Sequence, residues 1–291
     1  MRCHQALLIL WASAAMALAS DFSGTAALEY TRKAVSFGPR PPGSAANLKL
    51  QEYIQAQLKT LKCTVSVDAF TASTPVGPVP MKNIIAKFPG RPGKSVVFTG
   101  HFDTKSMPGR NFVGANDGGA SAGLLLELAR AVNRISHTGD VYIVWFDGEE
   151  AFGPWSSTDG VYGSRHLADK WAGAAMLSKI KALINVDMIG DKDLGILQEG
   201  NSSPALRDLV WKVAADLGYG KYFLNSGFAT EDDHIPFLRC GVNALDLIDF
   251  DYGPDNAYWH TAKDTMDKLS ANSLQVVGNV LLETLRRLEK R

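Results

Sequence analysis

The stretch Tyr142-Ile-Val-Trp-Phe-Asp147-Gly-Glu-Glu150-Ala-Phe152 decides the fold, because an apolar run changes abruptly into acidic residues within it. The β-branched and aromatic residues at its start predict a buried strand. Ligands of open α/β sheets bind beyond the carboxyl ends of the strands. The adjacent carboxylates of Glu149 and Glu150 repel one another unless a proton or a cation lies between them. The alternative is a plain turn followed by the acidic first turn of a helix, where the helix dipole favours glutamate.

Length and composition set the class of protein. The 291 residues suffice for one large α/β domain or two small ones, and 46% apolar residues supply a sizeable core. Lys plus Arg and Asp plus Glu both number 30, so the formal net charge is zero. No basic stripe or acidic tail indicates a nucleic-acid or membrane-surface partner. No internal repeat or low-complexity linker divides the chain, and we predict a single domain over residues 21–291 that acts as a monomer.

The N-terminus has the pattern of a targeting segment. Arg2 and His4 precede an apolar stretch over residues 6–19, and Ala17-Leu-Ala19 matches the small-x-small cleavage pattern. The apolar stretch is too short for a comfortable membrane span. We therefore predict that residues 1–20 are a signal peptide and that the mature protein is secreted or periplasmic, without a membrane partner.

Two cysteines remain after removal of that segment, Cys63 and Cys240. An exported protein could pair them. Cys63 lies near an early predicted strand and Cys240 at a predicted helix end, and nothing in these surroundings places them together. We expect both to be unpaired.

Strand and helix patterns alternate along the rest of the chain. Helical spacing of apolar residues predicts two helices within residues 24–61 and further helices at 118–132, 161–171, 203–217, 234–239 and 274–288. Alternation of apolar and polar residues predicts a strand at 62–70, and further strands are predicted at 81–88, 95–99, 141–146, 182–186 and 243–248, with a Pro/Gly turn at 74–80. This alternation predicts one α/β domain with a mostly parallel central sheet.

Side chains that can bind metal follow the central strands. The candidates are His101, Asp117, Glu150, Asp187 and His260. Five such residues at one edge of one sheet would surround a common point, and imidazoles with carboxylates but no thiolates suit zinc with an open coordination position. Taken singly, three of them have an ordinary structural alternative. Asp117 could be a helix N-cap, Asp187 could stabilise a turn, and His260 could be a buried histidine with its hydrogen bonds made inside the core. Asp103, two residues after His101, can orient that imidazole.

The motifs at these positions resemble a known superfamily, the zinc-dependent exopeptidases of leucyl-aminopeptidase type, over roughly residues 35–290. The motifs are His101-Phe-Asp103, Asn116-Asp117, Asp147-Gly-Glu149-Glu150, Asn185-Val-Asp187, Asp233-His234 and His260-Thr-x-x-Asp264-Thr. The resemblance implies a three-layer α/β sandwich around a mixed, mostly parallel central sheet, with metal at the carboxyl ends of the strands.

Within that superfamily the chain is more similar to the glutaminyl cyclases (glutaminyl-peptide cyclotransferases). The residues that carry this likeness are Trp155, Asp159, Tyr162-Gly-Ser-Arg-His-Leu-Ala168, Glu231-Asp-Asp-His-Ile-Pro-Phe-Leu-Arg239 and Trp259-His260. The resemblance implies an enzyme that converts the N-terminal glutamine of peptides into pyroglutamate and releases ammonia. Peptide or protein N-termini would be its substrates.

Residue roles follow from the same resemblance, motif by motif. One zinc would be bound by Asp117, Glu150 and His260. Glu149 would be the acid/base, with Asp187 and Asp232 as neighbouring carboxylates that orient it and share its proton. The substrate pocket would be formed by Trp155, Trp259 and, at its mouth, Lys105.

Two other functions stay open. A secreted zinc aminopeptidase would use a second metal bound by His101 and Asp187, with Asp117 as the bridge and Glu149 as general base. Those residues are all present, so ligand identity does not separate the two enzymes, whereas the aromatic pocket favours the cyclase. A non-catalytic module on a peptidase fold is opposed by the intact Glu149 and the complete ligand set.

Overall fold

A computed structural model describes residues 21–290. The predicted signal peptide therefore lies outside the described residues. Cys63 is half-buried and Cys240 is exposed, and both are free thiols in this structure. Among the described residues, no helix has both the length and the apolar character that a membrane crossing requires.

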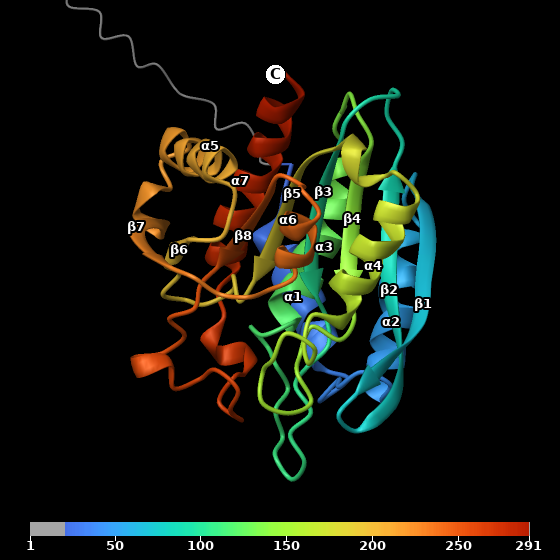
Figure 1. Cartoon of the computed structure of the whole chain (residues 1–291). Coiled ribbons are helices and arrows are strands. Elements are labelled where there is room, and N and C mark those ends of the chain that lie inside the picture. The colour runs from blue at the N-terminus through green and yellow to red at the C-terminus, as the bar shows by residue number, and fades with distance from the viewer. Residues whose placement is uncertain (1–20, 291) are drawn as a thin grey trace, which may run out of the picture.

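The centre of the molecule is a six-stranded sheet with strand order β1-β2-β4-β3-β5-β8 (Figure 1). Its strands are β1 Thr64–Thr74, β2 Gly77–Phe88, β3 Ser95–His101, β4 Val141–Phe146, β5 Ile180–Asp187 and β8 Ala244–Ile248. β4, β3, β5 and β8 run parallel, whereas β2 is antiparallel to both of its neighbours. The sheet is therefore mixed and mostly parallel, which confirms the predicted fold class.

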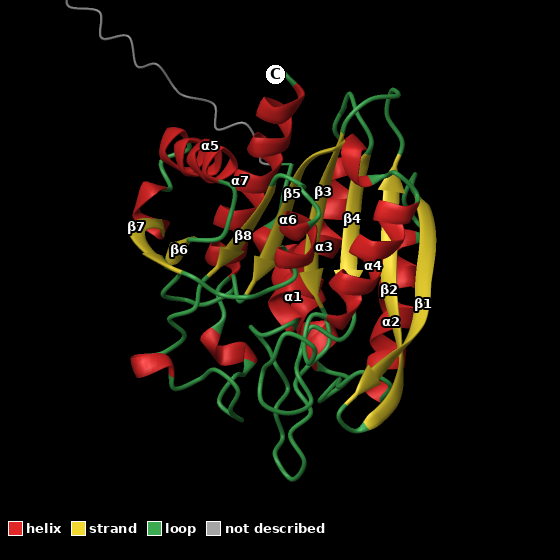
Figure 2. Ribbon diagram, in the orientation of Figure 1, coloured by secondary structure: helices red, strands yellow, loops and turns green. Residues whose placement is uncertain are grey.

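Helices cover both faces of the sheet, as Figure 2 shows. On one face lie α1 Gly24–Val35, α2 Ala45–Leu58, α3 Gly119–Val132 and α7 Ala271–Glu289. On the other lie α4 Tyr162–Gly173 and α6 Ile235–Arg239. Alternate residues of each strand supply the two cores: Val96 and Phe98 of β3 pack toward α3, and Val97 packs toward α4 and α6. This period of two is the physical basis of the three layers.

Two parts of the fold differ from the sequence prediction. Strands β6 Ile196–Glu199 and β7 Phe223–Phe228 form a separate parallel pair beside α5 Pro204–Asp216, and no strand was predicted at either place. β6 is four residues long, and the middle of β7 is exposed, so neither has a clear apolar pattern. The predicted turn at 74–80 is also too long, because cross-strand pairing continues to Thr74 and Gly77.

A buried arginine fastens the loop between α1 and α2 to the end of β3. Arg40 is fully buried, and its guanidinium donates hydrogen bonds to the carbonyl oxygens of Phe102 (3.2 Å), Val113 (2.7 Å) and Gly114 (3.0 Å). These segments lead directly into His101 and Asp117. The arginine therefore links the loop between α1 and α2 to the segment after β3 and to the segment before α3.

We expect Arg40→Met to lower the free energy of unfolding by about 3–5 kcal/mol, because truncating one partner of a buried charged network leaves the other groups unpaired. Denaturant unfolding followed by circular dichroism measures this loss. Arg91→Met is the matched control, because Arg91 is exposed in the turn between β2 and β3. An equal, small effect of both substitutions would contradict the role given to Arg40.

Candidate metal centre and substrate cavity

The predicted metal ligands converge at the carboxyl ends of the parallel strands. Nε2 of His260 lies 3.0 Å from Oε1 of Glu150 and 3.2 Å from Oδ2 of Asp117. These three residues come from the loop after β8, the turn after β4 and the turn before α3. Ligand atoms of all three lie within 4.8 Å of one another, which is the spacing expected around one ion.

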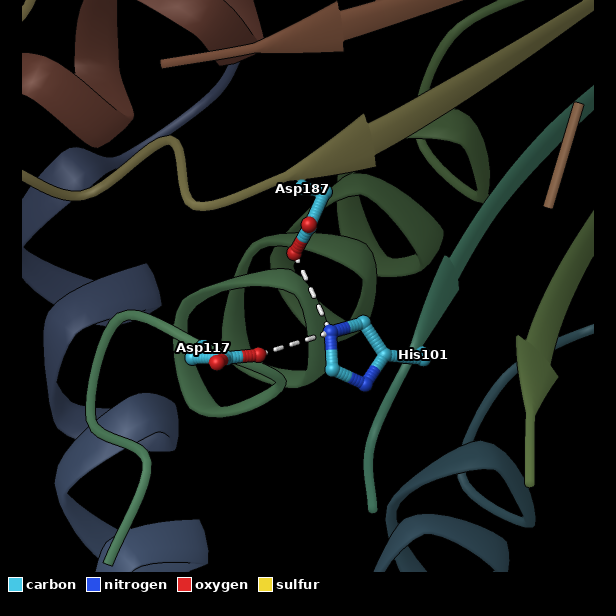
Figure 3. Close-up of side chains that lie close together, drawn as sticks. All are labelled: His101, Asp117 and Asp187. Atoms are coloured by element: carbon cyan, nitrogen blue, oxygen red, sulfur yellow. Dashed lines mark hydrogen bonds and ion pairs between the residues drawn. The ribbon is translucent and has the colours of Figure 1, made fainter. Parts of the chain in front are cut away.

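A second group of ligand-type side chains shares Asp117, as Figure 3 shows. Nε2 of His101 points at Oδ1 of Asp117, 3.3 Å away, and at Oδ1 of Asp187, 3.1 Å away. Asp117 thus presents one oxygen to each imidazole. The geometry brings together the five residues that follow the strand ends.

The donor set fits a divalent cation such as zinc. An imidazole nitrogen carries at most one hydrogen, yet Nε2 of His260 faces two carboxylates and so does Nε2 of His101. Within residues 21–290, the buried Oδ2 of Asp117 has no hydrogen-bond partner. A cation bound by Asp117, Glu150 and His260 would satisfy Nε2 of His260 and Oδ2 of Asp117, and the nitrogen and oxygen donors of these three residues are those of zinc sites with an open position.

Backbone contacts fix the two acidic segments. The Asp103 carboxylate accepts hydrogen bonds from the backbone N–H groups of Glu149 (3.1 Å) and Glu150 (3.3 Å), and it lies 3.5 Å from Nδ1 of His101. Asp264 accepts from the backbone N–H of Asp117 (3.1 Å). Asp103 therefore holds the glutamate pair in place and lies beside the imidazole of His101.

Two backbone conformations are specific to this site. Gly118 has φ +76°, and a Cβ there would come within 2.3 Å of the carbonyl oxygen of Asp103, so only glycine fits beside His101. Gly118 is also the N-cap of α3, so Asp117 is not an N-cap. His260 has φ +50°, a left-handed conformation that costs of the order of 1–3 kcal/mol in a non-glycine residue and persists at functional sites.

Glu149 lies inside the site but belongs to neither metal-type group. It is buried, and its pKa is raised well above the ordinary value by burial and by the charges of Glu150 and Asp232, against the lowering effect of His101. A carboxyl group with a raised pKa can both accept and donate a proton near neutral pH.

Three further buried carboxylates, those of Asp187, Asp232 and Asp246, lie close to the site. Burial and the charges of Asp232 and Asp117 raise the pKa of Asp187 to about 7, although His101 opposes them. Asn185 donates hydrogen bonds from Nδ2 to Asp232 (3.0 Å) and Asp246 (3.1 Å). The amide thus fixes two acidic side chains from different elements beside the site.

A cavity of about 580 Å³ opens onto this centre. Trp155, which is 41% exposed, and Trp259, whose ring stacks on His260 at 4.1 Å, form part of its wall. Lys105 donates to the Ala151 carbonyl oxygen (2.9 Å) and lies 3.7 Å from Oε2 of Glu150. The cavity is within the size range of small-ligand sites.

Nine of the ten predicted site residues line this cavity, and the tenth, His101, lies beneath it against Asp117 and Asp187. Sequence reasoning gave no role to Asp264 or Asn185, although both fall inside quoted motifs. It also missed Glu199, whose carboxylate lies 3.1 Å from Nε2 of His234 and accepts from the backbone of Ser202 (2.7 Å). Glu199 belongs to the unpredicted strand β6, so no pattern marked it.

A mixed α/β sheet with carboxylates and imidazoles gathered at its strand ends defines the class of metal-dependent exopeptidase-like proteins. Comparison with known proteins agrees: residues 83–285 match the model of peptidase family M28. The glutaminyl-peptide cyclotransferase of Drosophila melanogaster is 32% identical over 78% of this chain and 70% of its own length.

Solved structures extend this likeness. The glutaminyl cyclase of an Acidobacteriales bacterium is 40% identical, with a TM-score of 0.90 over 95% of this chain and 98% of that one. A Zn-dependent exopeptidase from Parabacteroides distasonis is 28% identical, with a TM-score of 0.83 over 94% and 100%. The chain therefore belongs to peptidase family M28 and, within it, to the glutaminyl-peptide cyclotransferases.

Proposed function

We propose that this chain is a zinc-dependent glutaminyl-peptide cyclotransferase that converts the N-terminal glutamine of peptides into pyroglutamate and releases ammonia. The observation that carries the proposal is the joint wall of the 580 Å³ cavity: Glu149, the group of Asp117, Glu150 and His260, and two tryptophans face one space. Its cyclotransferase relatives support the same activity.

The reaction is an intramolecular transfer. The α-amine attacks the γ-carboxamide carbon, a new C–N bond closes the five-membered lactam, and the old C–N bond breaks as ammonia leaves. Trp155 and Trp259 hold the glutamine side chain folded back toward its own amine. Asp117, Glu150 and His260 would bind the zinc, which when present polarises the γ-carbonyl as a Lewis acid.

Glu149 carries the proton in this scheme. Its carboxylate takes the proton from the attacking amine and delivers it to the departing nitrogen. The raised pKa that burial and neighbouring carboxylates give Glu149 suits both halves of this task. Like-charge repulsion from Glu150 and Asp232 helps keep the pKa of Glu149 high, and Asp187 and Asp232 are the neighbouring carboxylates that would orient the group.

A zinc aminopeptidase is the second candidate, and one observation favours it. His101 and Asp187 form a second metal-type group with Asp117, which is the arrangement that two metals bridged by one carboxylate require. Glu149 would then activate water for hydrolysis. Against it, Trp155 and Trp259 both line the cavity, and aromatic walls suit the flat carboxamide of a glutamine side chain.

A paired assay tests the proposal. On one zinc-replete sample, we expect ammonia release from Gln-initiated dipeptides and little hydrolysis of leucine p-nitroanilide. The zinc content by mass spectrometry should be one ion per chain. Hydrolysis of the leucine substrate without ammonia release, together with two zinc ions per chain, would assign the chain to the aminopeptidases.

Trp155→Leu should reduce kcat/KM for Gln-Ala amide by about tenfold or more, since one lost apolar contact in a substrate pocket costs roughly 10- to 200-fold. The loss in kcat/KM should come mainly from a higher KM. The melting temperature should change little because Trp155 is 41% exposed. Trp211→Leu on α5 is the control, because Trp211 lies outside the cavity. Equal kinetic effects of the two substitutions would remove Trp155 from the pocket.

We also expect this cyclotransferase to be exported after cleavage near residue 20, and to act as a single-domain monomer. N-terminal sequencing of the protein recovered from the periplasm or medium tests the first expectation. Size-exclusion chromatography with light scattering tests the second. Recovery of the uncleaved chain from the cytoplasm, or a dimer at working concentration, would contradict them.

A further inference from the structure

A second and larger cavity lies next to the catalytic one. It measures about 710 Å³, and its opposite walls are the end of β1 with the following turn, residues 70–75, and residues 153–166, which include the start of α4. We call it the hairpin groove. Gly153 and Pro154 line both cavities, so the two spaces adjoin at these residues.

The topology of the sheet explains why the groove borders the site. β1 and β4 both pair antiparallel with β2, so the carboxyl end of β1 points to the same edge as the carboxyl ends of the catalytic strands (Figure 1). β2 pairs with β4 only from Ile84 onward, whereas it pairs with β1 from Gly77. The hairpin therefore extends past the end of β4 and flanks the turn that carries Glu149 and Glu150.

A rigid ridge separates the two spaces. Trp155 faces the catalytic cavity, whereas Ser156, Thr158 and Asp159 line the hairpin groove. The Asp159 carboxylate fixes the ridge by accepting hydrogen bonds from the backbone N–H groups of residues 152 and 153 (2.9 and 2.8 Å) and from the Tyr162 hydroxyl (2.7 Å). Because residue 153 is a glycine, a bound peptide that leaves the catalytic cavity there would meet no side chain.

The groove is lined by one guanidinium, that of Arg165, one imidazole, that of His166, and one carboxylate, that of Asp159. Arg165 lies 4.9 Å above the Tyr162 ring, and His166 stacks on Phe70 at 4.2 Å. The one carboxylate among the lining residues, that of Asp159, is already engaged by three donors. Behind His166 stands the buried Asp68, 3.3 Å away, which Lys170 also contacts at 2.7 Å. Arg165 donates hydrogen bonds to the backbone carbonyl oxygens of Ser157 (3.5 Å) and Thr158 (3.0 Å), and the lining carboxylate of Asp159 does not pair with it.

We propose that the hairpin groove binds the residues that follow the N-terminal glutamine of the substrate, as an extended segment, and favours acidic side chains there. This inference rests on the proposed cyclotransferase function. The glutamine occupies the catalytic cavity, the chain passes over Gly153 and Pro154, and the downstream residues lie between the hairpin and α4. Phe70 and Tyr162 supply apolar contact, and Arg165 supplies the charge that selects an acidic side chain.

Peptide length and charge test the proposal. We compare kcat/KM for Gln-Ala amide with that for a neutral pentapeptide amide and for pentapeptides with aspartate or lysine at positions three to five. The neutral pentapeptide should exceed the dipeptide by about tenfold, the scale of one good apolar contact. The aspartate peptide should exceed the lysine peptide by about two- to fivefold at low salt, as for an exposed charge pair, and salt should reduce this ratio.

Matched variants locate the effect. Thr158→Trp fills the groove and should lower the ratio of pentapeptide to dipeptide kcat/KM toward one. Ser157→Trp is its control, because neighbouring Ser157 is equally exposed but lines neither cavity. Arg165→Gln should remove the preference for aspartate, whereas Lys170→Gln, which removes a charge from the same helix outside the groove lining, should retain it.

The outcomes separate this inference from the proposed function. Absence of ammonia release from every peptide would reject the cyclotransferase and this inference with it. Cyclisation at the same kcat/KM for all lengths and charges would reject the groove alone. Equal ratios in Thr158→Trp and Ser157→Trp would likewise overturn it, and circular dichroism of both variants verifies that each is folded.

Discussion

Glu149→Gln is expected to lower kcat for glutamine cyclisation by about 10²–10⁴-fold, the contribution of a positioned acid/base. Glutamine has the same shape as glutamate but cannot carry a proton between the attacking and departing nitrogens. Because Glu149 belongs to neither metal-type group, zinc content should stay at the wild-type level. Stopped-assay ammonia release and metal analysis of the same sample measure both quantities.

The stability of this variant is informative as well. Burial already favours the neutral form of Glu149, so replacement by a neutral amide of equal volume should change the melting temperature little. Glu52→Gln, on the exposed face of α2, is the matched control for expression and folding. Near-normal turnover in Glu149→Gln would end the acid/base assignment.

Asp117→Asn should abolish zinc binding and reduce kcat/KM by about 10³-fold or more, because a metal supplies several kcal/mol of charge stabilisation in such reactions. Asp117 is the one residue that belongs to both metal-type groups, so its loss affects one-metal and two-metal sites alike. Removal of metal from the wild-type protein by a chelator should have the same effect.

Reconstitution distinguishes metal loss from misfolding. Added zinc should restore the chelated wild-type protein but not Asp117→Asn, and both should keep their circular dichroism spectra. Asp251→Asn, an exposed carboxylate in the loop after β8, should respond to chelator and zinc as the wild type does. Full activity of the chelated wild-type protein would rule out a catalytic metal.

Much of the fold could be read from local patterns. All six strands of the main sheet were predicted, β1 from its alternating pattern and the central ones from the apolar runs that buried strands carry, and residues 141–146 match β4 at both ends. Short strands whose stability comes from neighbours lack this signal. β6 and β7 pair beside α5 and were therefore missed, as was the full extent of the β1–β2 hairpin.

The candidate site was predictable for a topological reason. Parallel strands point the same way, so residues placed after separate strands, such as His101, Glu150 and Asp187, must meet at one edge. The carboxylates that hold the site loops in place have no comparable sequence pattern. Asp264 accepts a hydrogen bond from the backbone N–H of Asp117, and Glu199 accepts one from the backbone N–H of Thr230. Both donors are distant in the sequence, and any loop carboxylate can accept such a bond once folding brings a donor near.

The sequence by itself determined the class of fold, the family and the identity of the side chains gathered at the strand ends. These follow from period, spacing and motif, which are properties of neighbouring residues. Only the tertiary structure decided that Asp117 gives one oxygen to each imidazole, that Glu149 stays outside both groups, and that a groove along the hairpin adjoins the catalytic cavity. Those features depend on how segments far apart in the chain pack, and the distances between such segments have no counterpart in local sequence.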